Sequence, residues 1–310
     1  MPGKSESRRP RILLTGSNGQ VGWSLARSLA PFGEVFAPER AEMDLASAES
    51  IRAAVRSFQP EWIVNPAAYT AVDKAESEPE MAYAVNRDAV AVLAEEARAL
   101  NAGMVHYSTD YVFDGARATP YVETDATGPL GVYGASKLAG EQALAASGAP
   151  HLIFRTSWVY GARGKNFLLT ILKLAREREE LRIVADQHGA PTWCGDLARI
   201  TAEAIRDTEA RAAEQGCSPA EALAERSGVY HACNSGETTW HGFAAEAVRQ
   251  MQGREPGRRF ARLVPIATAE YPTPARRPQY SLLNCGKLES RLGLRMGEWK
   301  RSLAEVLAAL

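Results

Sequence analysis

Short apolar runs alternate with longer segments in which apolar residues recur every three or four positions through the first half of the chain. The runs have the length of buried strands, and the periodic segments have the repeat of helices that bury one face. We predict strands at residues 12–14, 35–37, 62–64, 104–108 and 152–154, and helices at 21–29, 47–58, 80–100 and 133–146. This alternation predicts an α/β protein with a Rossmann-type, doubly wound parallel sheet.

After Tyr160 the alternation of apolar runs and helical segments becomes less regular. We predict helices at residues 166–177, 196–207 and 240–251 and strands at 182–184 and 230–232, with an Ala- and Glu-rich stretch before residue 227. The expected organisation is a disordered lead-in at 1–10, an NAD(P)-binding Rossmann domain at 11–160 and a smaller C-terminal substrate-binding lobe at 161–310. Whether elements of the lobe return to the main sheet is left open.

A glycine-rich turn follows the first predicted strand and precedes the first predicted helix. Its spacing is Gly-x-x-Gly-x-x-Gly, and alone it is equally consistent with a tight turn. Its position between strand and helix favours a dinucleotide site, where bare backbone meets a pyrophosphate at a helix N-terminus. The candidate residues are Gly16, Gly19, Gln20, Val21 and Gly22.

The ends of the next two predicted strands supply candidates for the remainder of the dinucleotide. An acid after the second strand would bind the ribose hydroxyls of NAD, whereas an arginine would pair with the phosphate of NADP. Glu39 and Arg40 are adjacent, so the signal is mixed; Arg40 favours NADPH, with use of NADH left open. Asp44 is a candidate for contact with the adenine. The small-residue loop 65–70 after the third strand lets a cofactor lie close to the backbone.

Tyr133 and Lys137 are the candidate proton-transfer pair. A spacing of four places both side chains on one helix face. An ammonium beside a phenol favours the phenolate, so we expect the pKa of Tyr133 to be lowered. A tyrosine of this kind can exchange a proton with a substrate oxygen.

The end of the fourth predicted strand carries polar groups. Thr109 can donate a hydrogen bond to a substrate carbonyl oxygen, and Asp110 can accept one from a sugar hydroxyl or polarise Tyr133. A polar turn that merely closes the strand is the alternative interpretation. Trp158 follows the fifth strand, where an aromatic residue can pack against a ligand or belong to the core.

Composition narrows the function further. The chain has 310 residues, a formal net charge of −1 and 45% hydrophobic residues, which argues against a general nucleic-acid or membrane-surface role. No apolar run is long enough to span a bilayer. The four cysteines, Cys194, Cys217, Cys233 and Cys285, are scattered without metal-ligand spacing, so we predict reduced thiols, a cytoplasmic protein and no metal.

The motifs together resemble the extended short-chain dehydrogenases/reductases and, within them, the dTDP-4-dehydrorhamnose reductase family. The most specific strings span residues 19–22, 71–76, 108–113, 155–160 and 272–278. The resemblance implies NADPH-dependent reduction of the C4 ketone of dTDP-4-dehydro-β-L-rhamnose, with Tyr133 as proton donor and Lys137 holding the nicotinamide ribose.

The same resemblance assigns further residues. It places Asp44, Leu45, Ala68, Tyr69 and Thr70 along the cofactor, beside the glycine turn. It places Thr109, Asp110 and Trp158 at the dTDP-sugar, and Arg276 and Arg277 suit its diphosphate. Some members dimerise through acids that share a metal; Ser24 stands where we would expect such an acid, which leaves a monomer or another homodimer.

Two other functions stay open at this point. The Tyr-Lys pair equally serves a reductase or epimerase of another nucleotide-linked 4-keto sugar. A non-catalytic, nucleotide-binding regulatory subunit is the alternative from a different class, and the complete set Thr109, Tyr133 and Lys137 favours catalysis over it.

Overall fold

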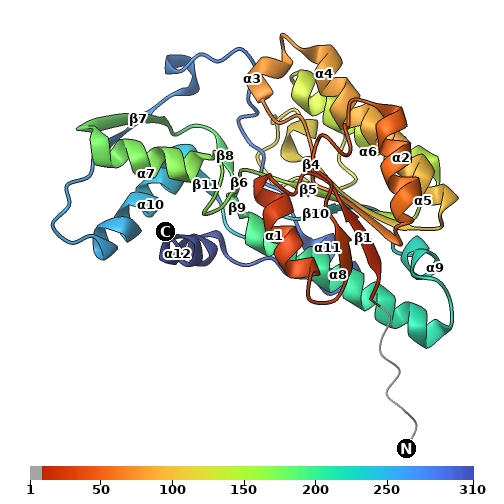
Figure 1. Cartoon of the computed structure of the whole chain (residues 1–310). Coiled ribbons are helices and arrows are strands. Elements are labelled where there is room, and N and C mark those ends of the chain that lie inside the picture. The colour runs from red at the N-terminus through yellow and green to blue at the C-terminus, as the bar shows by residue number, and fades with distance from the viewer. Residues whose placement is uncertain (1–8) are drawn as a thin grey trace, which may run out of the picture.

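The computed structural model describes residues 9–310, so most of the predicted lead-in at 1–10 lies outside the described residues. Its centre is a six-stranded, fully parallel sheet with the strand order β10-β5-β4-β3-β1-β2 (Figure 1). The strands are β1 (Arg11–Leu14), β2 (Glu34–Phe36), β3 (Trp62–Asn65), β4 (Gly103–Thr109), β5 (His151–Thr156) and β10 (Gly228–His231). The predicted doubly wound parallel sheet is therefore confirmed.

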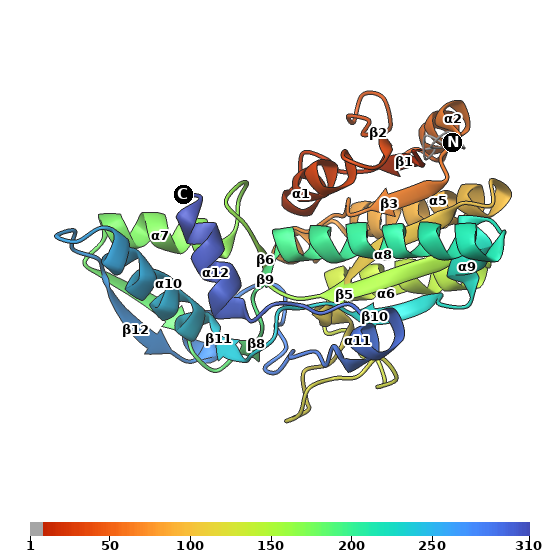
Figure 2. The same cartoon turned by 90° about the horizontal axis from the view of Figure 1, so that it is seen from below.

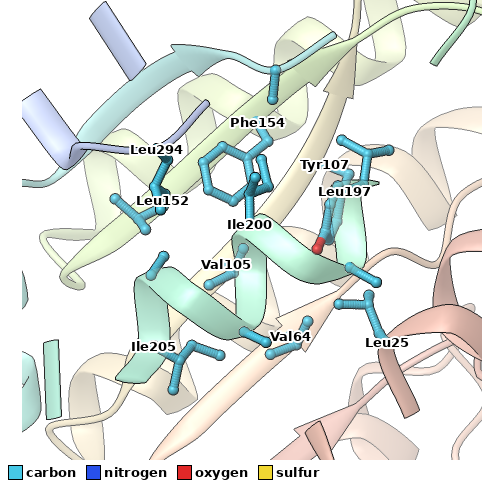
Figure 3. Close-up of a cluster of buried hydrophobic side chains, with 14 of the residues drawn as sticks. Leu25, Val64, Val105, Tyr107, Leu152, Phe154, Leu197, Ile200, Ile205 and Leu294 are labelled. Carbon is cyan, nitrogen blue, oxygen red and sulfur yellow. The ribbon is translucent and has the colours of Figure 1, made fainter. Parts of the chain in front are cut away.

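Helices cover both faces of this sheet. One face carries α1 (Gln20–Leu29), α8 (Cys194–Gln215) and α11 (Gly286–Leu292), and the other carries α2 (Ala48–Phe58), α5 (Ala89–Ala99) and α6 (Val132–Ser147). Figure 3 shows the core on the α8 side, where Leu197 and Ile200 of α8 lie over Val105 and Phe154 of the sheet. These side chains are fully removed from water, and each such burial stabilises the fold by about 1.5–3 kcal/mol.

Two helices depart from the prediction. The helix predicted at 80–100 is interrupted: α4 (Pro79–Tyr83) is followed by a π-helical turn, η1 (Ala84–Asp88), before α5. The interruption accompanies a polar anchor, because the Asn86 amide bonds both the N–H and the C=O of Tyr69 and the hydroxyl of Ser136. The helix predicted at 196–207 begins earlier and extends to Gln215, where Ala and the i,i+4 pair Arg211–Asp207 favour helix.

The later part of the chain builds a smaller lobe beside one end of the sheet, at the left of Figure 2. Its apolar core lies between α7 (Phe167–Glu177), α10 (Trp240–Arg254) and α12 (Trp299–Ala308). The parallel pair β7 (Glu180–Val184) and β12 (Arg262–Ile266) flanks these helices, and two short pairs join the lobe to the sheet: β6 (Val159–Tyr160) with β9 (Thr192–Trp193), and β8 (His188–Gly189) with β11 (Thr238–Thr239).

The chain after residue 160 also contributes to the main sheet. β10 pairs with β5 from Gly228 to His231, and α8 packs along α1. The remaining short elements are α3 (Val72–Ala75), α9 (Pro219–Ala224) and the 3₁₀ turns η2 (Asp110–Val112) and η3 (Thr268–Glu270). The division into domains at residue 160 stays a prediction.

Candidate active site

A cleft of about 580 Å³ lies at the C-terminal ends of β1, β3, β4 and β5. This is the edge of a parallel sheet at which α/β proteins bind ligands. It brings together twelve of the residues predicted from the sequence, namely Gly16, Gly19, Gln20, Val21, Gly22, Ala68, Thr70, Thr109, Asp110, Tyr133, Lys137 and Trp158.

One end of the cleft is the glycine turn before α1. Gly16 adopts φ +58°, and a Cβ on Gly22 would lie 2.0 Å from the carbonyl oxygen of Gly16, so neither position accepts an ordinary side chain. α1 begins at Gln20 without a side-chain cap on its first N–H groups. Uncapped backbone donors and the positive end of the helix dipole favour an anion here.

Lys137 ends at a buried hydrogen-bonded chain beneath the cleft. Its Nζ lies 3.3 Å from Nε2 of His106, whose Nδ1 lies 3.1 Å from Nδ2 of Asn65. The Asn65 carbonyl oxygen accepts a 2.6 Å hydrogen bond from Thr15. Burial lowers the pKa of Lys137 to about 8, and burial together with Lys137 holds the pKa of His106 well below its usual range. The histidine is therefore neutral, and its ring, held by Asn65, lies against the lysine amine.

Tyr133 lies one turn before Lys137 on α6. That helix approaches the loop after β4 closely, because a Cβ on Gly134 would lie 2.2 Å from the carbonyl oxygen of Tyr111. The expectation of a lowered phenol pKa was wrong for this structure. Protein atoms around the phenol disfavour the phenolate and raise the pKa of Tyr133 to about 12, and the nearby Thr109 hydroxyl only partly opposes this. The phenol therefore keeps its proton at neutral pH.

Two neighbouring hydroxyls at the end of β4 differ in their freedom to donate. Thr109 gives its hydrogen to Asp110 Oδ1 at 3.0 Å and accepts from the Tyr111 N–H at 3.2 Å. The Ser108 hydroxyl is buried and has no hydrogen-bond partner among residues 9–310. Burial raises the pKa of Asp110 to about 6. The Ser108 hydroxyl is thus buried without a partner, whereas Thr109 lies beside the Tyr133 phenol and shares its hydrogen with Asp110.

Trp158 forms part of the cleft wall on the side of the lobe. Its ring stacks on Trp240 of α10, with centroids 3.7 Å apart and an interplanar angle of 10°. Its backbone has φ +46°, a left-handed conformation that costs a bulky residue of order 1–3 kcal/mol. The strained backbone and the stacked indole hold a flat aromatic surface at the cleft.

Several predicted cofactor residues lie outside the lining of the cleft. Exposed Glu39 and Arg40 follow β2, and Arg40 Nε lies 3.8 Å from Asp44 Oδ1. Leu45 packs against the core on the α2 side, and the Tyr69 hydroxyl donates to Glu78 at 2.8 Å. Because its hydroxyl is engaged with Glu78, we expect Tyr69 to contact the cofactor through its backbone and not through its phenol.

The arginine pair is divided between two further cavities. Arg277 donates two 2.8 Å hydrogen bonds to the carboxylate of Asp73 and lines a cavity of about 770 Å³ with Gln187 and Trp240. Arg276 is exposed and lines a narrow cavity that also touches Tyr133. The two side chains therefore do not converge on one point.

Other cleft residues received no role from the sequence. Ser108, Thr156 and Ser157 are buried at its base, and Lys165 adds an exposed cation at its rim. Like that of Ser108, the hydroxyl of Thr156 has no hydrogen-bond partner in the part of the chain that is described. Ser108 and Thr156 lie at strand ends within the strings 108–113 and 155–160 named in the sequence analysis. Nothing in the sequence distinguishes Lys165 from other surface lysines.

Residues 9–310 hold no group of three or more His, Cys, Asp or Glu side chains placed to bind a metal. Ser24, at the position considered for a shared metal, is buried and donates to Cys194 Sγ at 3.2 Å. None of their helices has the length and apolarity needed to cross a bilayer.

Comparison with known proteins identifies the family. The model of the RmlD substrate binding domain matches residues 10–310. The chain belongs to this family. It is 50% identical to dTDP-4-dehydrorhamnose reductase of Burkholderia thailandensis, over 94% of this chain and 95% of that protein. It is 45% identical to the enzyme of that name from Escherichia coli K12, over 96% of this chain and 97% of the relative.

Solved structures that resemble this chain come from the same family as these relatives. The crystal structure of dTDP-4-dehydrorhamnose reductase from Bacillus anthracis in complex with NADP superposes with a TM-score of 0.87 at 32% identity, covering 98% of this chain and all of that one. An orthologue from Clostridium acetobutylicum gives a TM-score of 0.84 at 34% identity, over 96% and 99% of the two chains. The family resemblance read from the motifs is thus confirmed.

Proposed function

We propose that this chain is an NADPH-dependent oxidoreductase that reduces the C4 ketone of dTDP-4-dehydro-β-L-rhamnose to dTDP-β-L-rhamnose, the final step of dTDP-L-rhamnose synthesis. The observation that carries the proposal is the arrangement of one cleft. Its glycine turn and uncapped helix suit a pyrophosphate, and its other end holds Tyr133, Lys137 and the β4 hydroxyls. The choice of substrate rests on the relatives, which are named dTDP-4-dehydrorhamnose reductase.

The cleft fits a dinucleotide on two observations of this structure. Neighbouring atoms of Ala67 and of Gly16 occupy the space that side chains at Gly16 and Gly22 would need, so only bare backbone can form this turn, which is what close approach to a pyrophosphate requires. The buried hydroxyls of Ser108 and Thr156 lack partners and await a polar ligand. Gly19, Gln20 and Val21 would hold the pyrophosphate, and Ala68 and Thr70 would flank the middle of the cofactor.

The chemistry supplied by the bound reduced dinucleotide is transfer of a hydride to the ketone carbon. Tyr133 donates its phenolic proton to the oxygen, and the raised pKa keeps that proton in place until an alkoxide, the stronger base, develops. Thr109, which lies beside the phenol, donates a hydrogen bond to the same oxygen once the sugar displaces Asp110.

Lys137 acts beside the phenol and at the ribose. Nearly all of the lysine is removed from water, and His106 fixes its amine. Protonated Lys137 stabilises the phenolate that remains after proton transfer, and its N–H groups bind the nicotinamide ribose. Trp158 supplies a flat surface for the sugar. Arg276 binds its diphosphate, and Arg277 joins it once it leaves Asp73.

Oxidation of NADPH by the purified protein, with dTDP-4-dehydro-L-rhamnose as substrate, tests the proposal. We expect one NADPH consumed for each dTDP-L-rhamnose formed, and slower turnover with NADH. An epimerase would convert the sugar without net loss of NADPH, and a regulatory subunit would bind nucleotide without turnover. Cytoplasmic location, a monomeric or homodimeric state and the lack of a nucleic-acid partner stay predictions.

A further inference from the structure

Two cysteines that are far apart in the sequence lie side by side in the fold. Cys233 follows β10, and Cys285 precedes α11; their Sγ atoms are 3.6 Å apart. The backbone N–H of Cys233 donates to Cys285 Sγ at 3.4 Å, and the Cys233 thiol donates to the carbonyl of Leu283 at 3.6 Å. Both thiols are free in this structure.

We propose that Cys233 and Cys285 form a reversible modification site, at which a hydroperoxide converts the two thiols into a disulfide. A disulfide has a sulfur–sulfur distance of about 2.05 Å, so the sulfur atoms must approach by about 1.5 Å from their present 3.6 Å. The other cysteines are not placed for this reaction, because Cys194 contacts Ser24 and Cys217 contacts Gln215.

The two thiols differ in a way that assigns their roles. Cys285 is partly exposed, and its contact with the Cys233 thiol and N–H lowers its pKa. The same contact, together with burial, raises the pKa of Cys233. Both line a cavity of about 400 Å³ through which a small oxidant can enter. Cys285 is therefore the thiolate that meets the oxidant, and Cys233 is the resolving thiol.

The reaction balances in two steps. The Cys285 thiolate attacks one peroxide oxygen, the O–O bond breaks, and Cys285 becomes a sulfenic acid as the other oxygen leaves as water or an alcohol. The Cys233 sulfur then attacks the sulfenyl sulfur, the S–O bond breaks, and its oxygen leaves as water. Both sulfurs are oxidised, and one hydroperoxide is reduced by two electrons.

The disulfide would restrict a segment, residues 282–284, that is connected through Tyr121 to Phe113, the residue after η2. Residues 282–284 are held to Tyr121 by two 2.8 Å backbone hydrogen bonds, and Tyr121 stacks on Phe113, which follows η2. Cys233 belongs to the same apolar cluster as Phe113 and Tyr121. The new loop spans the 52 positions from 233 to 285, so the cross-link removes substantial freedom from the unfolded chain.

The test treats the purified full chain with a small molar excess of hydrogen peroxide and then counts thiols in denaturant. We expect titratable thiols to fall from four to two, a single cross-linked peptide pair containing Cys233 and Cys285, and a melting temperature higher by about 5 °C. Dithiothreitol should restore all four thiols and the original melting temperature.

Variants separate this site from general oxidation. Cys285→Ser, with Cys233→Ala as a second variant, should abolish the cross-link and the rise in melting temperature, while Cys217→Ser should retain both. Four persistent thiols, a bond through Cys194 or Cys217, or a melting temperature that does not rise on cross-linking would each overturn the proposal. None of these readouts depends on reductase activity.

Discussion

The two ends of the predicted sugar site are built differently. At the catalytic end, Tyr133 and Lys137 project from one helix packed on the sheet, and a buried chain through His106 and Asn65 holds the lysine. At the diphosphate end, Arg276 is exposed on an irregular segment, and Arg277 is engaged with Asp73. A proton transfer needs groups fixed in advance, whereas charge attraction acts over longer distances and tolerates movement.

The largest effect is expected at the fixed end. Tyr133→Phe removes the proton donor without emptying the helix face, so we expect turnover to fall by about 10³-fold while the dissociation constant for NADPH changes little. Tyr107→Phe is the matched control, because Tyr107 also lines the cleft but its hydroxyl bonds Thr201 on α8 at 2.5 Å. Near-normal turnover in the Tyr133 variant would remove that residue from the mechanism.

Lys137→Met should reduce turnover about 100-fold and weaken cofactor binding, since it removes the two roles proposed for this residue, stabilisation of the phenolate and a contact to the ribose. The same substitution should stabilise the free protein. Burial lowers the pKa of Lys137 from 10.5 to about 8, a shift of about 2.5 units, which corresponds to roughly 3 kcal/mol as an upper figure.

The sign of this stability effect follows from proton binding. Between pH 8 and pH 10.5 the unfolded chain keeps a proton that the folded chain releases, so stability rises with pH across this window. The gain from Lys137→Met should be full below pH 8 and should vanish by pH 10.5. Denaturant unfolding at pH 7 and pH 10 measures it, and a gain that does not depend on pH would contradict the buried-charge account.

Smaller effects are expected at the loose end. Arg276→Ala should raise KM for the dTDP-sugar about tenfold and leave kcat nearly unchanged, because one charge-assisted contact contributes roughly 1.5 kcal/mol. Arg277→Ala should raise KM less, since this arginine must first leave Asp73. Steady-state kinetics of the two variants decide between them, and a loss confined to kcat would assign both arginines to the catalytic step instead.

The smallest effect concerns the choice of cofactor. Arg40 is exposed and only loosely paired with Asp44, so it is free to meet the extra phosphate of NADPH. Arg40→Ala should lower the ratio of kcat/KM for NADPH over NADH by about three- to tenfold. Glu39→Ala is the comparison, and it should move the ratio in the other direction; an unchanged ratio in both would place discrimination elsewhere.

The sheet and the fixed end of the site were predictable because their signals are local. The strands of the first half are short apolar runs, most of its helices show a helical repeat, and the glycine turn and the Tyr-Lys pair are short motifs. The π-helical turn at Asn86 was not predictable, because it accompanies contacts with Tyr69 and Ser136 that are distant in sequence. The pKa of Tyr133 also escaped prediction, since a spacing of four residues shows neither how deeply the phenol is buried nor that the Lys137 amine lies against His106.

Long-range contacts limited the prediction elsewhere. Four cysteines without a shared motif gave no reason to pair Cys233 with Cys285, and the three-dimensional path of the chain brings their sulfurs together. Adjacent arginines suggested one binding point, but successive residues of an irregular segment point in different directions, and Arg277 finds Asp73 more than two hundred positions earlier.

The place of β10 at the outer edge of the sheet bears on how the protein is synthesised. During translation β5 leaves the ribosome well before residues 228–231, so its hydrogen-bonding edge stays without its neighbour while some seventy residues follow. The nascent chain therefore passes through a stage with an open strand edge, the form most prone to pairing with other chains. A gene fragment that stops soon after β5 would make that stage permanent.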